Sequence, residues 1–80
     1  MKTDHYLGYI EIRLEDRDWL VNRGRSARGF IEDLKRGIPW DQREYDPERK
    51  AWTVPEEYGD LVREYYKKRF SDPNQEEMGF

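Results

Sequence analysis

The sequence predicts an α+β fold in the order ββαββα, with a four-stranded, mainly antiparallel sheet and two helices packed on one face. Three observations support this class: an alternating apolar segment near the N-terminus, a hairpin motif in the second half, and two segments with helical apolar spacing. Packing both helices on one face of the sheet would bury every apolar stripe in the chain.

The composition indicates a folded but highly charged domain. Of the 80 residues, 41% are charged and 35% hydrophobic, and the aromatic content of 15% supplies much of the surface that a thin core can bury. The last ten residues hold three acidic residues and no basic one, so residues 1–70 carry 15 of each sign. We expect a single domain over residues 1–70 and a flexible tail over residues 71–80.

Several function classes are disfavoured. The chain has no cysteine, which excludes disulfides and thiolate metal sites. No apolar run has the length of a signal peptide or a membrane span, so we expect a cytoplasmic protein without a membrane partner. Nothing indicates a metal or a small-molecule cofactor. The net charge of −3 predicts no strong general attraction to nucleic acid, so the placement of the charges matters more than their total.

The first two strands are predicted from apolar alternation. Residues 6–14 alternate, and their apolar members on one face are Tyr6, Ile10, Ile12 and Leu14. Residues 15–18 are a polar break of hairpin-loop length, and residues 19–21 resume as a short second strand. A helix beginning near Asp16 is the alternative, although Gly24 would end it early.

The first helix is predicted over residues 27–37. Ser26 is a candidate N-cap, because its hydroxyl can accept a hydrogen bond from a free backbone N–H. The apolar stripe at helical spacing is Ala27, Phe30, Ile31 and Leu34. Gly37 is predicted to adopt a left-handed C-cap, Ile38 to make the hydrophobic contact that follows it, and Pro39 to stop the helix.

A second hairpin is predicted over residues 43–54. Asp46 and Pro47 are typical of a β-turn, because proline fixes φ and the aspartate accepts from the turn backbone. Tyr45 and Trp52 have strand chemistry on either side. We expect Trp52 to be mostly buried beneath the C-terminal helix.

The second helix is predicted to start at Pro55, which the first helical position tolerates. Acidic residues follow the proline and a basic cluster, Lys67, Lys68 and Arg69, ends the helix, as the helix dipole favours. The predicted buried stripe is Tyr58, Leu61, Val62, Tyr65 and Phe70.

The stretch RGIPWDQREYDPERKAWTVPEEYGDLV resembles a known family. An Ile-Pro before a hairpin, an aromatic-Asp-Pro turn, a Lys-x-Trp and a Val-Pro leading into a helix are similar to the HepA-related-protein (HARP-like) domain found beside annealing helicases and in phage and plasmid replication proteins. The resemblance covers roughly residues 27–66 and is strongest at 45–55. It implies an α+β module that helps an attached or partner enzyme engage branched or single-stranded DNA. The chain has no glycine-rich phosphate loop, so it carries no ATPase of its own.

The strongest candidate binding residues are Arg23, Arg25 and Arg28, in a stretch free of acidic residues and flanked by glycines. They precede or begin a helix, where the dipole disfavours positive charge, so stability alone would select acidic residues there. Arginines beside exposed amides suit an anion. The alternative is a solvated loop whose arginines pair with nearby carboxylates. Those carboxylates are Asp16, Asp18 and Glu32.

Four residues of the second hairpin are further candidates. Arg49 and Lys50, at its tip, are expected to face solvent, where they could contact phosphates or serve only to keep the tip polar. Tyr45 and Trp52 could stack on bases, or pack under the helices. Catalysis is not expected: His5 is the only histidine, and the carboxylates are interleaved with bases.

Two functions remain open at this point. The first is a non-enzymatic accessory module that binds single-stranded or branched DNA and acts with a replication or repair enzyme. The second is a protein-binding module, of a kind that phages encode, that modulates a replication or transcription enzyme. The arginines and the family resemblance favour the first, and the net acidity favours the second.

Overall fold

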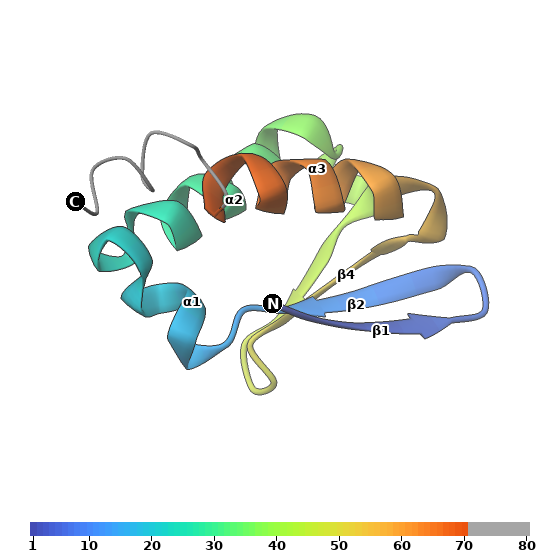
Figure 1. The fold of residues 1–80 in the computed structure, drawn as a ribbon. Helices are drawn as coiled ribbons and strands as arrows, with labels where there is room; N and C mark the ends of the chain where they lie inside the picture. The colour runs from blue at the N-terminus through green and yellow to red at the C-terminus, as the bar shows by residue number, and fades with distance from the viewer. Residues whose placement is uncertain (71–80) are drawn as a thin grey trace.

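Four antiparallel strands form one sheet in the order β1-β2-β4-β3, and two long helices cover one of its faces (Figure 1). The computed structural model describes residues 1–70; the predicted tail, residues 71–80, lies outside the described part. The strands are β1 (Lys2–Tyr6), β2 (Tyr9–Arg13), β3 (Glu44–Asp46) and β4 (Ala51–Pro55). The helices are α1 (Asp16–Leu20), α2 (Arg25–Gly37) and α3 (Gly59–Phe70), with 3₁₀ turns η1 (Val21–Gly24), η2 (Trp40–Gln42) and η3 (Glu56–Tyr58). The predicted α+β class and ββαββα order are confirmed.

The first hairpin lies closer to the N-terminus than predicted. Instead of one strand over residues 6–14, the chain turns at Leu7 and Gly8 between β1 and β2. Gly8 has a φ of 88°, a left-handed conformation that glycine adopts without steric cost. The turn places Tyr6 opposite Tyr9, with stacked rings 4.9 Å apart, rather than on the face of Ile10. The prediction that Tyr6 shares a face with Ile10 is therefore wrong.

Residues 19–21 form no strand, because they belong to α1 and the 3₁₀ turn that follows it. The alternative, a helix beginning near Asp16 and cut short at Gly24, is the correct one. The Asp18 carboxylate accepts a hydrogen bond from the backbone N–H of Glu15 at 2.7 Å, which satisfies a donor at the helix start. The spacing Glu15-x-x-Asp18 therefore favours helix over the strand that the aromatic and aliphatic residues suggest.

The core lies between the sheet and the two long helices. Ile10 pairs with Val54 and Ile12 with Trp52, so these side chains share the face that the helices cover. The buried cluster is Ile10, Ile12, Phe30, Leu34, Ile38, Val54 and Val62. Phe30 and Leu34 of the first predicted stripe and Val62 of the second belong to it, whereas Ile31 lines a separate small cavity. Tyr58, Leu61, Tyr65 and Phe70 of the second stripe are partly buried against the same cluster.

The ends of the helices differ in detail from the prediction. Gly24, not Ser26, is the N-cap of α2, and Ser26 is buried in the first turn. Gly37 stays helical and is not a left-handed cap. A Cβ at position 37 would collide with the hydroxyl of Tyr65, so glycine is required there by the packing of α3. Pro55 ends β4 and caps the 3₁₀ turn η3, so α3 begins at Gly59, four residues after the predicted start of the helix at Pro55.

The second hairpin is confirmed, and Trp52 is largely buried as predicted, on the side of α1 and α2. The Asp46 carboxylate accepts from the backbone N–H of Glu48 at 3.0 Å and so closes the turn. The smaller part of Trp52 is exposed, and it packs against the core cluster, so the prediction that it is mostly buried is confirmed. It lines a small cavity together with side chains of α1 and α2. Val54, two residues on, takes the fully buried central position on the same face.

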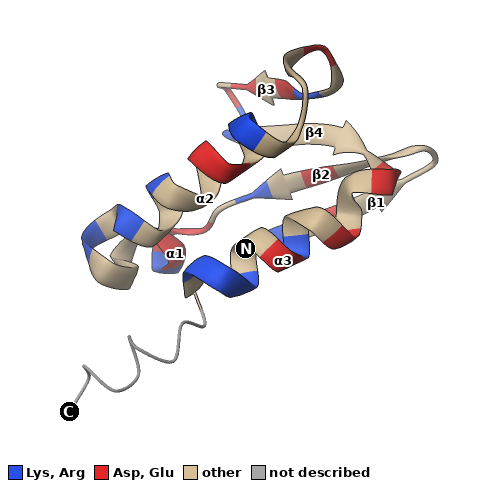
Figure 2. Ribbon diagram, turned by 90° about the horizontal axis from the view of Figure 1, so that it is seen from above, with Lys and Arg blue, Asp and Glu red and all other residues tan. Residues whose placement is uncertain are grey.

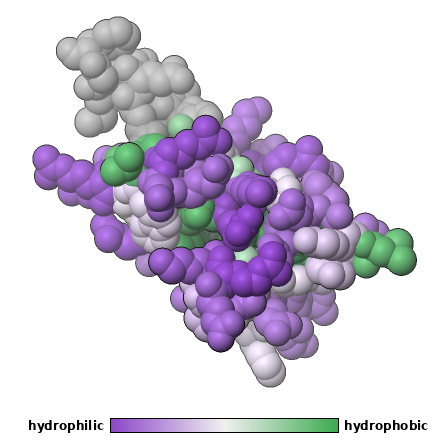
Figure 3. All heavy atoms as spheres, turned by 90° about the horizontal axis from the view of Figure 1, so that it is seen from below, coloured by the Kyte–Doolittle hydropathy of each residue, from purple (hydrophilic) through white to green (hydrophobic). Residues whose placement is uncertain are grey.

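Charged pairs join neighbouring elements within each layer. Asp33 of α2 accepts two hydrogen bonds from Arg69 of α3, at 2.8 and 3.0 Å. On the open face of the sheet, Glu11 is almost completely buried and pairs with Arg49 at 2.7 Å. Figure 3 shows that face covered mostly by hydrophilic side chains, with hydrophobic ones most prominent at its margins. The open face of the sheet is thus polar.

Candidate nucleic-acid interface

The three predicted arginines lie in one short segment, here called the arginine turn, residues 22–28. Its backbone is left-handed at three successive positions, with φ of 51° at Asn22, 56° at Arg23 and 81° at Gly24. Such a conformation costs a non-glycine residue on the order of 1 kcal/mol or more. The turn reverses the chain between α1 and α2, so that α2 begins at Arg25. Arg23 is therefore held in a strained conformation and directed to the surface.

None of the three guanidinium groups has an ion-pair or hydrogen-bond partner among residues 1–70. All three residues are exposed. Two of the carboxylates that could have neutralised them are engaged elsewhere. Asp18 pairs with the Met1 amine at 2.7 Å and accepts from the Tyr66 hydroxyl at 2.6 Å, and Glu32 pairs with Arg36 at 3.8 Å. The alternative of a self-neutralised loop therefore does not hold within this part of the chain.

The end of α3 adds positive charge near the arginine turn. A Cβ at Gly29, just after the turn, would lie 2.9 Å from the guanidinium carbon of Arg69. Figure 2 shows the blue segments at the start of α2 and at the end of α3 toward the same end of the molecule. Arg69 itself is bound by Asp33, but Lys67 and Lys68 are exposed. From the sequence, these lysines were expected to interact favourably with the dipole at the end of α3. In the fold they also lie toward the same end of the molecule as the arginine turn.

The hairpin tip is a separate element. Arg49 is tied to Glu11, although 53% of its side chain remains exposed. Lys50 is exposed and has a φ of 52°, which makes it a strained non-glycine position, as Asn22 and Arg23 are. Both line an open hollow of about 580 Å³, here called the basic hollow. Its other charged residues are Lys2, Arg13, Glu15, Asp16 and Arg17. Basic residues outnumber acidic ones around it.

Tyr45 and Trp52 lie beside a smaller cavity of about 150 Å³, here called the aromatic pocket. Their ring centroids are 4.9 Å apart and the rings are tilted by 45°. The third ring of the pocket is Trp19, from α1, which the sequence prediction missed because it placed residues 19–21 in a strand. A Cβ at Gly24 would lie 3.6 Å from the Trp19 ring. Trp19 therefore packs beside the arginine turn and also lines the aromatic pocket.

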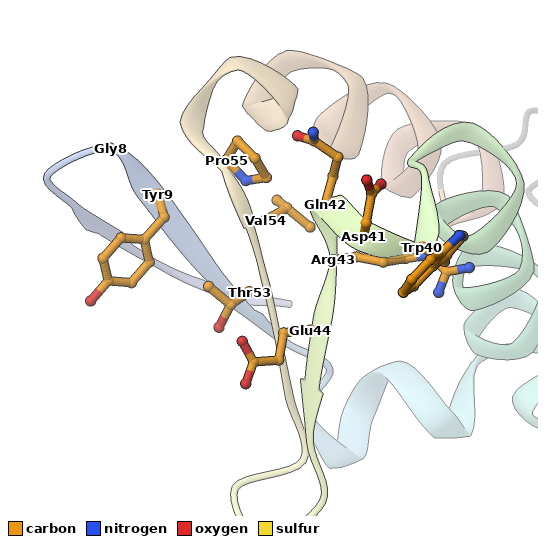
Figure 4. A pocket seen from close by; sticks show the side chains of 10 residues that line it. All are labelled: Gly8, Tyr9, Trp40, Asp41, Gln42, Arg43, Glu44, Thr53, Val54 and Pro55. Atoms are coloured by element: carbon orange, nitrogen blue, oxygen red, sulfur yellow. The ribbon is translucent and has the colours of Figure 1, made fainter.

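A third hollow, here called the edge groove, has a volume of about 480 Å³ and lies at the other end of β4. Tyr9 and Trp40 stand at opposite sides of it, with Thr53 and Glu44 between them (Figure 4). Pairing between β3 and β4 stops at Glu44 and Thr53, so the last residues of β4 have no strand neighbour on this side. Trp40 is 78% exposed. The groove contains no predicted site residue.

Neither a metal-binding cluster of acidic or histidine residues nor a helix able to cross a membrane occurs within residues 1–70. No protein-family model, curated protein or solved structure matches the chain.

Proposed function

We propose that this protein is a non-enzymatic accessory module that binds single-stranded or branched DNA through the arginine turn. The observation that carries the proposal is the state of Arg23, Arg25 and Arg28, which are exposed and lack any partner in the described part of the chain. Five other arginines of the described chain pair with carboxylates, namely Arg17, Arg36, Arg49, Arg63 and Arg69. Arginine is the residue best suited to phosphate, because its planar fork donates two parallel hydrogen bonds.

The neighbourhood of the turn supports a single-stranded substrate. Trp19 is 42% exposed and packs beside Gly24, within the turn. Exposed aromatic rings beside basic residues are the combination that single-strand binders use, since a ring can stack on any unpaired base. The resemblance of residues 27–66 to the HARP-like domain supports the same substrate and a replication or repair enzyme as the partner.

The test is a comparison of two triple variants at equal net charge. Fluorescence anisotropy would measure the affinity for a labelled single-stranded oligonucleotide and for a fork at low salt. The first variant is Arg23→Ala, Arg25→Ala, Arg28→Ala. The control is Lys35→Ala, Arg36→Ala, Arg63→Ala, which removes three exposed basic residues elsewhere on the helices.

We expect the arginine-turn variant to lose most of the affinity and the control variant to lose little. Equal losses in the two variants would show that only net charge matters, and that the arginine turn is not the site. Absence of binding by the parent protein at low salt would reject the proposed function itself.

A second function, binding of a protein partner, is favoured by the edge groove. Exposed Trp40 and Tyr9 flank Val54 and Pro55, the end of β4, which has no neighbouring strand on this side. Because Pro55 has no N–H to donate, a peptide bound there would be held mainly by its side chains against the rings. If the parent protein does not bind DNA, binding of a protein partner at this groove becomes the favoured function. The partner would then be a replication or transcription enzyme.

A further inference from the structure

We propose that the aromatic pocket accepts one unstacked pyrimidine base of a single strand whose phosphates lie along the neighbouring basic residues. This inference rests on the proposed function and adds to it a site for the base. Three elements, α1, β3 and β4, each contribute one ring to the pocket: Trp19, Tyr45 and Trp52.

The exposure of these rings favours a ligand. Trp19 is 42% and Tyr45 is 45% exposed, although the molecule has few apolar residues with which to build a core. Leaving that surface in water forgoes the free energy that burial of an aromatic side chain normally supplies. A base that stacks on the rings would cover the surface without any rearrangement of the core beneath it.

The volume of the pocket selects the size of the ring. An apolar cavity of roughly 150 Å³ in a protein can hold one benzene molecule. The aromatic pocket has about this volume, and Leu14 and Ile31 complete its apolar wall. A six-membered pyrimidine therefore fits, whereas the two fused rings of a purine would project out of the pocket.

Charged groups at the pocket fit the rest of a nucleotide. Lys50 and Asp16 line both the aromatic pocket and the basic hollow, so the two lie side by side. The lysine can donate to a ring carbonyl or to a phosphate, and the carboxylate can accept from the N–H groups of thymine or cytosine. Arg13 and Arg17 of the hollow, with Lys50, supply positive charge for the flanking phosphates on one side. On the other side of the pocket, the arginine turn beside Trp19 can bind the remaining flanking phosphates.

The experiment isolates the contribution of one base. The probes are three labelled 12-nucleotide strands with the same number of phosphates: one fully abasic, one with a single central thymine, and one with a single central adenine. Anisotropy titrations of the whole protein at low salt compare them. We expect the thymine probe to bind roughly 5- to 150-fold more tightly than the abasic probe, the range associated with stacking one base, and the adenine probe to gain less.

Variants assign the effect to the pocket. Tyr45→Ala should abolish the gain from thymine, and Tyr45→Phe should retain it, because stacking needs the ring and not the hydroxyl. Trp40→Ala is the matched control, since Trp40 is exposed but lies at the edge groove. Thermal melting of each variant checks that the fold is intact. Should Tyr45→Ala unfold, Trp19→Leu provides a second pocket variant, which removes another ring of the pocket and should also abolish the gain.

The outcomes separate the two proposals. If all three probes bind with equal affinity, the base pocket is rejected while the proposed function stands. If adenine equals thymine, the assignment to pyrimidines is rejected. If Trp40→Ala removes the gain and Tyr45→Ala does not, the base binds elsewhere. If no probe binds, the proposed function fails together with the pocket.

Discussion

Charged residues serve opposite purposes in two regions of this molecule. Between the helices and the N-terminal segment, Asp18 and Asp33 are buried and each has a partner. Asp18 pairs with the Met1 amine and accepts from the Tyr66 hydroxyl, and Asp33 pairs with Arg69. In the arginine turn, Arg23, Arg25 and Arg28 are exposed and no residue of the described chain pairs with them. Arg23 also lies at a left-handed φ of 56°, so the turn combines unpaired charge with local backbone strain, and neither stabilises the fold.

The largest change in stability is expected when the Asp33 carboxylate is removed. Asp33→Ala breaks both hydrogen bonds to Arg69 and leaves a partly buried guanidinium without a partner. We expect the free energy of unfolding to fall by about 1–3 kcal/mol, less than for a fully buried pair because about a third of the Arg69 side chain is exposed. Chemical denaturation measures it.

Glu32→Ala, one residue away, is the control for that variant. Its partner Arg36 lies 3.8 Å away and both side chains are mostly exposed. Its loss should cost about 0.5 kcal/mol or less. Equal effects of the two variants would contradict the distinction between buried and exposed pairs.

Acid should destabilise the protein through the same two carboxylates. Burial alone would raise the pKa of Asp18, but hydrogen bonds from the Met1 amine, Tyr66 and the Glu15 backbone outweigh it and lower the pKa. The hydrogen bonds from Arg69 lower the pKa of Asp33. Below the ordinary value of 3.8, the unfolded chain takes up protons before the folded one, so the free energy of unfolding decreases as the pH falls.

Denaturation midpoints measured between about pH 5 and pH 2 would show this decrease. This range brackets the ordinary pKa of aspartate, which is about 4. In the double variant Asp18→Asn, Asp33→Asn the decrease should be shallower than in the parent. An unchanged pH profile in that variant would mean that neither pair stabilises the folded state.

A smaller effect is expected at the other end of the pH scale. Burial and the hydrogen bond to Asp18 raise the pKa of Tyr66 from 10.0 to about 12. The stability that Tyr66 contributes is complete below pH 10.0 and is lost as the pH rises toward 12. Tyr66→Phe should cost about 1 kcal/mol at neutral pH, where it leaves Asp18 without one donor. It should also remove this alkaline loss, which spectroscopic titration of unfolding can follow.

The smallest effect, with the opposite sign, is expected in the arginine turn. Arg23→Gly replaces a residue at a φ of 56° by one that adopts this conformation freely. We expect the free energy of unfolding to rise by about 0.5–1 kcal/mol while affinity for DNA falls. Destabilisation by this change would show that the Arg23 side chain supports the fold, and the comparison between the two regions would fail.

The sequence predicted the second hairpin and both long helices, because their turn residues and apolar spacing are local signals. Asp46 and Pro47 specify their turn whatever surrounds them. The first hairpin and α1 were misplaced, since alternation of apolar residues continues through the turn at Gly8 and hides it. Gly37 shows a different limit. Its role depends on Tyr65, which belongs to another helix, so no local pattern could reveal it.

Only part of the candidate site was predicted, because some of its features depend on contacts between residues distant in the sequence. The exposure of Arg23, Arg25 and Arg28 was expected from their position in a loop. Their lack of partners depends on Asp18 being occupied by the Met1 amine and Tyr66, from both ends of the described chain. The role of Trp19 in the aromatic pocket was missed, although the spacing of Glu15 and Asp18 indicates the helix that positions it.

The most direct test of the central claim is the salt dependence of DNA binding. The logarithm of the association constant for a single-stranded oligonucleotide would be measured against the logarithm of salt concentration for three proteins. These are the parent, the arginine-turn triple alanine variant, and the control variant lacking Lys35, Arg36 and Arg63. Each phosphate contact contributes about 0.7 to the slope.

We expect the arginine-turn variant to flatten the slope by roughly 2 while its melting temperature stays at or above that of the parent, because the turn's arginines have no partner within residues 1–70 to lose. The control variant should keep the parent slope. An arginine-turn variant that binds with the parent slope, or that loses binding only because it unfolds, would contradict the account.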